Sequence, residues 1–154
     1  MTYVVVALKS EAQAFVDRFK LPKTRQDNDI AIFVSGIGVQ KMFEITKKIV
    51  KKMTKEDKIL NVGICGANHD FQIGELIDGF KQKLTCVDTE ISKDDGYSVV
   101  DMESSGFIEA TKMIKNRYMF KIVSDYFQPH TITKEKTKQL VFNQIDEIMK
   151  RIET

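Results

Sequence analysis

The 154-residue chain is poor in the residues that cross-link small domains or bind metals. It has no tryptophan, two cysteines, two histidines and two prolines. Cys65 and Cys86 show no metal-ligand spacing, so we expect reduced, buried thiols rather than a disulfide or a nucleophile. His69 and His130 fall in polar loop segments, where an isolated histidine is usually a surface group. No metal site is therefore expected.

The sequence also lacks an excess of one charge and a long apolar run. Its 24 basic and 22 acidic residues give a net charge of +2, too small to recruit nucleic acid or an anionic membrane. The longest apolar run, Val4 to Leu8, is far shorter than a membrane span, and Met1 to Tyr3 does not resemble a signal peptide. We expect one cytoplasmic domain over residues 1–154 that binds neither nucleic acid nor membrane.

Several apolar runs of strand length show no alternation of apolar and polar residues. They cover residues 2–7, 30–34, 58–67 and 118–125. Such runs are typical of strands that are covered on both faces, as in a parallel sheet. The pattern predicts an α/β fold, a three-layer domain with a mixed, mostly parallel central sheet flanked by helices.

Two further regions have weaker patterns. Residues 71–78 and 83–88 are expected to be short strands, and the intervening 79–82 has the length of a hairpin loop. Residues 133–152 are expected to form one helix. Its apolar stripe comprises Val141, Phe142, Ile145, Ile148, Met149 and Ile152.

The segment from Val99 to Ala110 combines a strand end with a helix start. After the two valines, a helical packing face is expected from Met102, Gly106, Ala110, Met113 and Ile114. The small residues 104–106 would let another backbone approach. Asp101 and Glu103 lie at the junction, where carboxylates either cap a helix or bind a ligand, and for Glu103 both interpretations stay open.

Acidic residues follow three of the predicted strands. Glu11, Glu103 and Asp125 stand at such positions, and the loop 35–38 (SGIG) follows another strand. Ligands of open α/β sheets bind at the carboxyl ends of strands, so these groups are expected to share one cleft. Three carboxylates beside free backbone N–H groups suit a hydroxyl-rich ligand, an activated water and a leaving group that needs a proton. For Glu11, helix capping is the alternative.

Five segments in chain order carry a family resemblance. They are residues 5–11 (VVALKSE), 35–38 (SGIG), 61–67 (NVGICGA), 100–103 (VDME) and 124–125 (SD). With them the chain resembles the purine nucleoside phosphorylase superfamily, and within it most closely the methylthioadenosine/S-adenosylhomocysteine nucleosidases, in a shortened form.

The resemblance implies a role for each matching residue. Glu11, with Ser35 nearby, would position the attacking water, and Asp125, oriented by Ser124, would protonate N7 of a purine. Glu103 would bind the ribose hydroxyls. The remaining substrate-binding positions would be Gly36, Gly38, Gly66, Ile91, Asp101 and Met102. The family needs no cofactor and is usually oligomeric, which implies a homodimer here. The implied reaction is hydrolysis of a methylthioadenosine-like nucleoside in methionine salvage.

The chain also departs from this family. Family members are larger, and the missing residues fall between Asp78 and Lys83. Glu90 replaces an aromatic residue that stacks on the purine, and Lys121 replaces an arginine. Two alternatives therefore stay open: a phosphorylase and a nucleoside-binding relative without turnover. Phosphorolysis is disfavoured because none of the four arginines falls in a matching segment, and a bidentate guanidinium suits phosphate.

Overall fold

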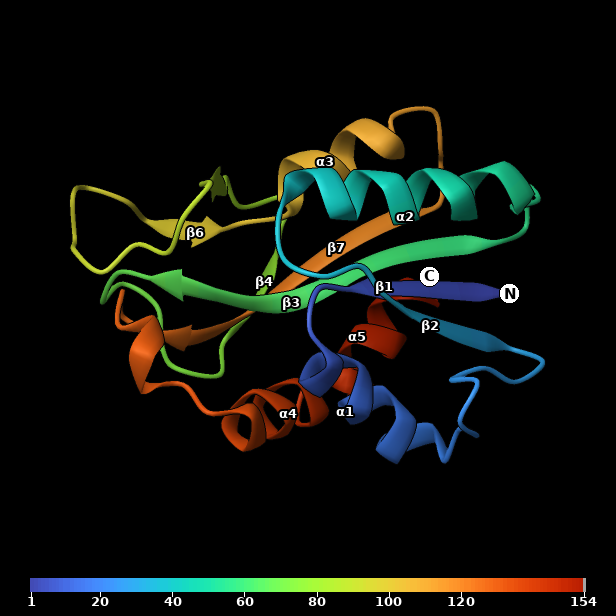
Figure 1. Ribbon diagram of the computed structural model, residues 1–154, viewed down its shortest axis with the longest axis horizontal. Helices are drawn as coiled ribbons and strands as arrows, with labels where there is room; N and C mark the ends of the chain where they lie inside the picture. Colours follow the sequence, from blue (N-terminus) through green and yellow to red (C-terminus); the bar gives the residue numbers. More distant parts are fainter. Residues whose placement is uncertain (154) are drawn as a thin grey trace.

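The protein is built on a mixed seven-stranded sheet (Figure 1). The computed structural model describes residues 1–153. The strands are β1 (Thr2–Val6), β2 (Ile30–Val34), β3 (Lys58–Ala67), β4 (Leu76–Asp78), β5 (Thr85–Cys86), β6 (Val99–Asp101) and β7 (Arg117–Asp125). The helices are α1 (Lys9–Phe19), α2 (Val39–Lys52), α3 (Ser104–Ala110), α4 (Lys134–Phe142) and α5 (Ile145–Ile152), with a short 3₁₀ turn, η1 (Pro129–Thr131).

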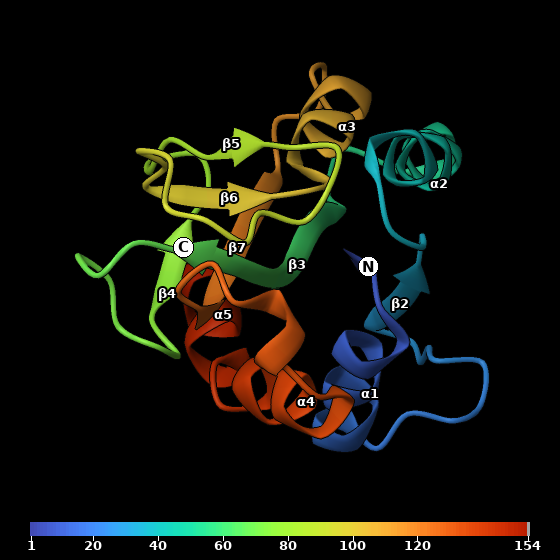
Figure 2. The same cartoon turned by 60° about the vertical axis from the view of Figure 1, so that its left-hand side comes forward.

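The long strand β3 joins the two parts of the sheet. β1 pairs in parallel with β2 and with the first half of β3, and β7 runs parallel to β3 almost throughout. At its carboxyl end β3 pairs antiparallel with β6 through Gly66 and Ala67, and β5 lies parallel to β6. Figure 2 shows β5 and β6 side by side.

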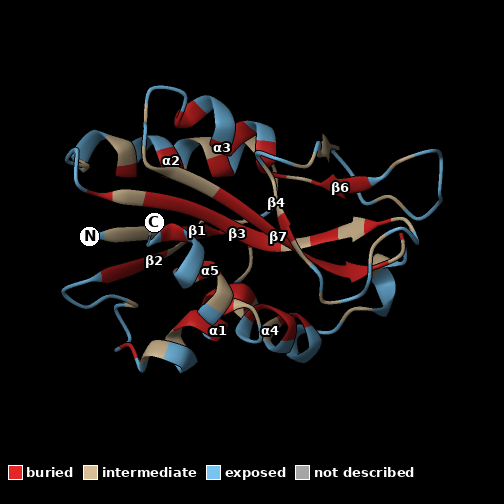
Figure 3. Ribbon diagram, turned by 180° about the vertical axis from the view of Figure 1, so that it is seen from behind, coloured by how far each residue is buried: buried red, intermediate tan, exposed pale blue. Residues whose placement is uncertain are grey.

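Helices cover both faces of the sheet, which confirms the three-layer prediction. Figure 1 shows α2 and α3 on one face and α1, α4 and α5 on the other. One apolar cluster lies between the sheet and α1, α4 and α5, and a second lies under α2 and α3. Figure 3 shows buried residues along the strands and exposed residues on the outer sides of the helices. Central strands buried on both faces explain the apolar runs without alternation.

The thin first turn of α3 does allow a close backbone approach. A side chain at Gly106 would overlap the backbone carbonyl oxygen of Val39, the first residue of α2. The start of α3 is therefore held directly against the start of α2. Because each helix follows a strand end, this contact brings two of the predicted ligand-binding segments together.

The predicted hairpin over residues 71–88 is wrong. β4 pairs antiparallel with β7, and β5 pairs in parallel with β6, so the two short strands have different neighbours. The spacing of residues 71–88 does not indicate these partners, which lie outside that segment.

Two helix predictions also need correction. The helix predicted over residues 133–152 is two helices, and the Gln144 side chain between them donates to the carbonyl of Gly74 at 2.8 Å. Phe142 is 39% exposed rather than part of the buried stripe. The other helix, α3, ends at Ala110, and Met113 beyond it is 87% exposed, so Met113 does not belong to the packing face.

The prediction of two buried thiols is correct for one cysteine. Both cysteines are free; Cys65 is buried as expected, but Cys86 is only partly buried.

Within residues 1–153, no helix combines the length and the apolar character required to cross a membrane.

Candidate active site

A cavity of about 140 Å³ opens where the carboxyl ends of β1, β3 and β7 meet the start of α3. Eight of the eleven residues predicted to form the site line it: Glu11, Gly66, Ile91, Asp101, Met102, Glu103, Ser124 and Asp125. The rest of the wall is Ala7, Leu8, Ile37, Ile64, Cys65, Val87, Glu90, Val100 and Pro129. Acidic groups that are more than 100 residues apart in sequence therefore share one hollow.

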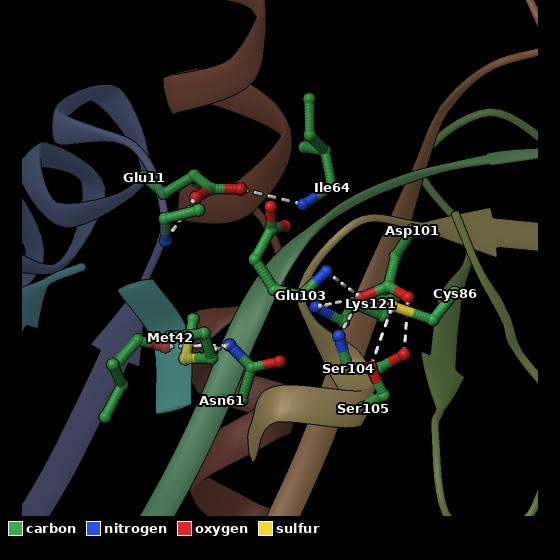
Figure 4. Close-up of polar contacts among 12 residues, drawn as sticks. Glu11, Met42, Asn61, Ile64, Cys86, Asp101, Glu103, Ser104, Ser105 and Lys121 are labelled. Carbon is green, nitrogen blue, oxygen red and sulfur yellow. Dashed lines mark hydrogen bonds and ion pairs between the residues drawn. The ribbon is translucent and has the colours of Figure 1, made fainter. Parts of the chain in front are cut away.

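Glu11 is fixed by three backbone N–H groups. Its Oε1 accepts from Ala7 and Leu8, at 3.1 and 2.9 Å, and Oε2 accepts from Ile64 of β3 at 2.8 Å. The capping interpretation is thus correct for one oxygen, while the other reaches across to the sheet (Figure 4). Burial raises the pKa of Glu11 from 4.5 to about 7. A carboxyl with that pKa can accept a proton near neutral pH.

The neighbouring glycine leaves room for the Glu11 carboxylate. A methyl group at Gly63 would lie 3.0 Å from Oε2 of Glu11 and 3.5 Å from Nζ of Lys121. The bare backbone of β3 at this residue lets the carboxylate and the ammonium approach the sheet together.

Asp101 and Glu103 differ in whether their side chains cap the helix α3. Asp101 caps α3: its Oδ2 accepts from the backbone N–H of Ser104 at 2.8 Å, and its Oδ1 accepts from the Ser104 hydroxyl at 2.5 Å. Glu103 makes no side-chain cap bond to its own helix. Its Oε2 instead accepts from the N–H of Gly38 at 2.8 Å, and Figure 4 shows its carboxylate facing that of Glu11. Glu103 therefore lines the cavity with a carboxylate that is not used to cap its own helix.

Lys121 is a buried cation behind these acidic groups that sequence reasoning did not place in the site. Its Nζ lies 3.0 Å from Oδ2 of Asp101, and both side chains are at most 2% exposed. Burial opposes the charged form of each group. The Asp101 and Glu103 carboxylates outweigh this for Lys121 and raise its pKa, whereas Lys121 and the Ser104 hydroxyl lower the pKa of Asp101.

The same cation acts on the two remaining carboxyl groups of this cluster. Burial raises the pKa of Glu103, and Lys121 opposes that rise, as it does for Glu11. Asp101 lines the cavity and also makes the capping bonds to Ser104 and the ion pair with Lys121. The sequence feature that could have indicated a buried cation is Lys121 itself, a lysine inside the apolar run 118–125 at a buried position of the strand.

Asp125 ends β7 beside the cavity and is held by its neighbours. The Ser124 hydroxyl lies 2.5 Å from Oδ1 of Asp125 and 3.3 Å from the carbonyl oxygen of Cys65. The N–H of Gln128 donates to Oδ2 at 2.7 Å. This turn requires a left-handed backbone at Phe127, with φ of 58°, so the chain reverses sharply immediately after the carboxylate.

The glycine loop differs from the prediction in part. Ser35 and Gly36 do not line the cavity: the Ser35 hydroxyl donates to the carbonyl of Gly36 at 2.7 Å, and both backbone N–H groups pair with the end of β1. Gly38 contributes through its bond to Glu103. Ile37 forms part of the wall instead. Within residues 1–153 no group of three or more His, Cys, Asp or Glu side chains is arranged to hold a metal ion.

Comparison of the sequence with known proteins gives no match. No protein-family model matches the chain, and neither does any curated protein.

Several solved structures superpose on most of the chain. A Francisella philomiragia protein named as a 5′-methylthioadenosine/S-adenosylhomocysteine nucleosidase superposes with a TM-score of 0.75 at 12% identity, over 99% of this chain and 98% of that one. The futalosine hydrolase of Helicobacter pylori gives 0.74 at 13% identity, with 97% of each chain covered.

A third structure is a variant of the 5′-methylthioadenosine/S-adenosylhomocysteine nucleosidase (MTAN) of Chlamydia trachomatis bound to 5′-methylthioadenosine (MTA). It gives a TM-score of 0.72 at 16% identity, with 98% of each chain covered. At identities this low, the superpositions show that the chain shares the α/β fold of these proteins.

Proposed function

We propose that the protein hydrolyses the N-glycosidic bond of a purine nucleoside, with a methylthioadenosine-like compound as its substrate. The observation that carries this proposal is the meeting of Glu11, Glu103 and Asp125 in one cavity. The named activities of the structural neighbours support the same reaction class.

In this reaction Glu103 binds the two ribose hydroxyls, because one carboxylate can accept both protons. Asp125 in its protonated form gives a proton to N7 of the purine, so the base leaves as a neutral group. The C1′–N9 bond breaks, and the ionised carboxylates stabilise the positive charge that develops on the sugar. Glu11 takes a proton from water as the water oxygen bonds to C1′.

Water is the nucleophile in this proposal. The described wall of the cavity has five carboxyl side chains, Glu11, Glu90, Asp101, Glu103 and Asp125, and no lysine, arginine or histidine. A phosphate ion entering this wall would meet like charge without a guanidinium to bind it. The buried Lys121 does not compensate, since it is already paired with Asp101.

The test is base release from methylthioadenosine, adenosine and inosine, with and without added phosphate. We expect release without phosphate and no acceleration when phosphate is added. Strict dependence on phosphate would identify a phosphorylase instead. Thermal stabilisation by nucleosides without any base release would identify a binding protein.

The finer assignments depend on that substrate. A methylthioadenosine-like substrate would place the protein in methionine salvage in the cytoplasm, and the resemblance noted above favours a homodimer. Light scattering of the purified chain tests the dimer, with a mass near 17.7 kDa contradicting it.

A further inference from the structure

Glu90 and Asp101 are the two acidic residues of the described cavity wall that the proposed reaction does not use, and Asp101 is already paired with Lys121. Glu90 is exposed to solvent, whereas Glu11, Asp101, Glu103 and Asp125 are buried. It stands in the segment after β5, where the N–H of Val87 donates to the carbonyl of Asp101 at 2.8 Å. That bond ties the segment to the end of β6 and so to the Met102–Glu103 wall.

The same segment borders a second cavity. This cavity, about 400 Å³ in volume, shares Ile37 and Met102 with the first and includes Asp88 and Lys41. Residues 88–90 therefore pass the junction of the two hollows. Asp88 and Lys41 lie on the wall of the second cavity, and Glu90 lies on the wall of the first.

The proposed binding mode directs the 5′ end of the ligand to this junction. With the ribose hydroxyls on Glu103 and the base on Asp125, the remaining substituent of the sugar is at C5′. The wall next to Glu103 is Met102, which both cavities share. A 5′ substituent that leaves the first cavity over this wall passes the segment that carries Glu90.

We infer that Glu90 is a specificity-determining residue that favours nucleosides with a cationic 5′ substituent, such as an amine, and disfavours those with a 5′ phosphate or carboxylate. The inference rests on the proposed function. Its physical basis is the absence of any basic side chain from the described wall of the first cavity. A cationic group gains attraction there, and an anionic group meets repulsion from Glu90 and from the carboxylates beneath it.

The experiment measures binding with ligands that cannot be cleaved. Formycin A joins its base to ribose through carbon, so calorimetric titration reports affinity without turnover. The series is formycin A, its 5′-amino-5′-deoxy derivative and its 5′-monophosphate. Each is titrated into the wild type, Glu90→Gln and Asp95→Asn. Asp95 is a matched control because it is an exposed carboxylate of the same loop that lines neither cavity.

We expect the wild type to bind the 5′-amino derivative about fivefold more tightly than formycin A, which is the upper range for an exposed ion pair. The 5′-monophosphate should bind most weakly. Glu90→Gln should remove the preference for the amine over formycin A, and Asp95→Asn should retain it.

Two results would overturn the inference in different ways. If formycin A binds the wild type but Glu90→Gln keeps the same preference among the three ligands, the assignment of Glu90 is wrong and the nucleoside site stands. If none of the three ligands binds the wild type, the nucleoside site fails and the inference fails with it.

Discussion

Replacing Lys121 with methionine tests whether this buried cation organises the acidic site. Methionine fills nearly the volume of the lysine stem, so the substitution removes the charge with little loss of packing. Asp101 keeps its hydrogen bonds to Ser104 but loses the ammonium at 3.0 Å. A buried carboxylate that loses its partner costs about 3–5 kcal/mol of unfolding free energy.

The size of this loss should depend on pH. In the wild type the pKa of Asp101 is lowered, so its contribution to stability is fully present above pH 3.8 and is lost as the pH falls through the pKa of the folded state. The raised pKa of Lys121 means that its stabilisation is present below 10.5 and is lost as pH rises through the folded-state value. The pair therefore contributes fully between pH 5 and pH 8.

In Lys121→Met the burial of Asp101 is no longer compensated, so the pKa of Asp101 rises. Protonation then relieves part of the cost at low pH, and the loss should be larger at pH 8 than at pH 5. Urea denaturation of both proteins at the two pH values measures this difference.

A double-mutant cycle with Asp101→Asn supplies the control. The double variant has neither charge, so we expect it to be more stable than Lys121→Met alone, with a coupling energy of about 2 kcal/mol or more. A loss below about 1 kcal/mol in Lys121→Met, equal at both pH values and uncoupled from Asp101, would refute the central role of Lys121.

Three further predictions use the same geometry. Because the pKa of Glu11 is raised, its contribution to the free energy of unfolding is fully present below pH 4.5 and is lost as pH rises through about 7. Denaturation across this range should show the free energy of unfolding fall by about 3 kcal/mol in the wild type, and this fall should be absent in Glu11→Gln. Asp125→Asn can keep the bond from Gln128, and the Ser124 hydroxyl can donate to Cys65 instead, so the variant should fold normally while base release falls by about 10²–10⁴-fold; unchanged release would exclude Asp125 as the acid. Gly106→Ala should lower the unfolding free energy by about 1–3 kcal/mol because the methyl group overlaps the start of α2, and a melting temperature equal to the wild type would contradict the close contact.

The sequence was most informative at the ends of the predicted strands, each of which is a local pattern. The parallel strands β1, β3 and β7 bring their carboxyl ends to one edge, as predicted, and this brings Glu11 and Asp125 together. Glu103 also lines the cavity, but it follows β6, which runs antiparallel to β3, so the predicted reason does not hold for this residue.

The errors have non-local causes. The partners of β4 and β5 are β7 and β6, which the residues between 71 and 88 do not encode by spacing. The break after α4 involves a bond from Gln144 to Gly74, 70 positions away in sequence.

The site shows the same limit. The sequence does not distinguish the roles of Asp101 and Glu103, which both lie at the start of α3. Only the fold shows that Asp101 accepts from Ser104 and pairs with Lys121, while Glu103 accepts from the N–H of Gly38. Lys121 was noted as a departure from a family pattern rather than recognised as the cation of the site. Its position within an apolar strand carried that information, because a lysine is almost never fully buried unless it is paired.

The most direct test of the acidic nucleoside site is a crystal structure with formycin A. We predict that the ribose hydroxyls lie within hydrogen-bond distance of Glu103, that the base contacts Ser124 and Asp125, and that C1′ faces Glu11. Formycin A bound outside this cavity, or bound with its sugar away from Glu103, would contradict the account.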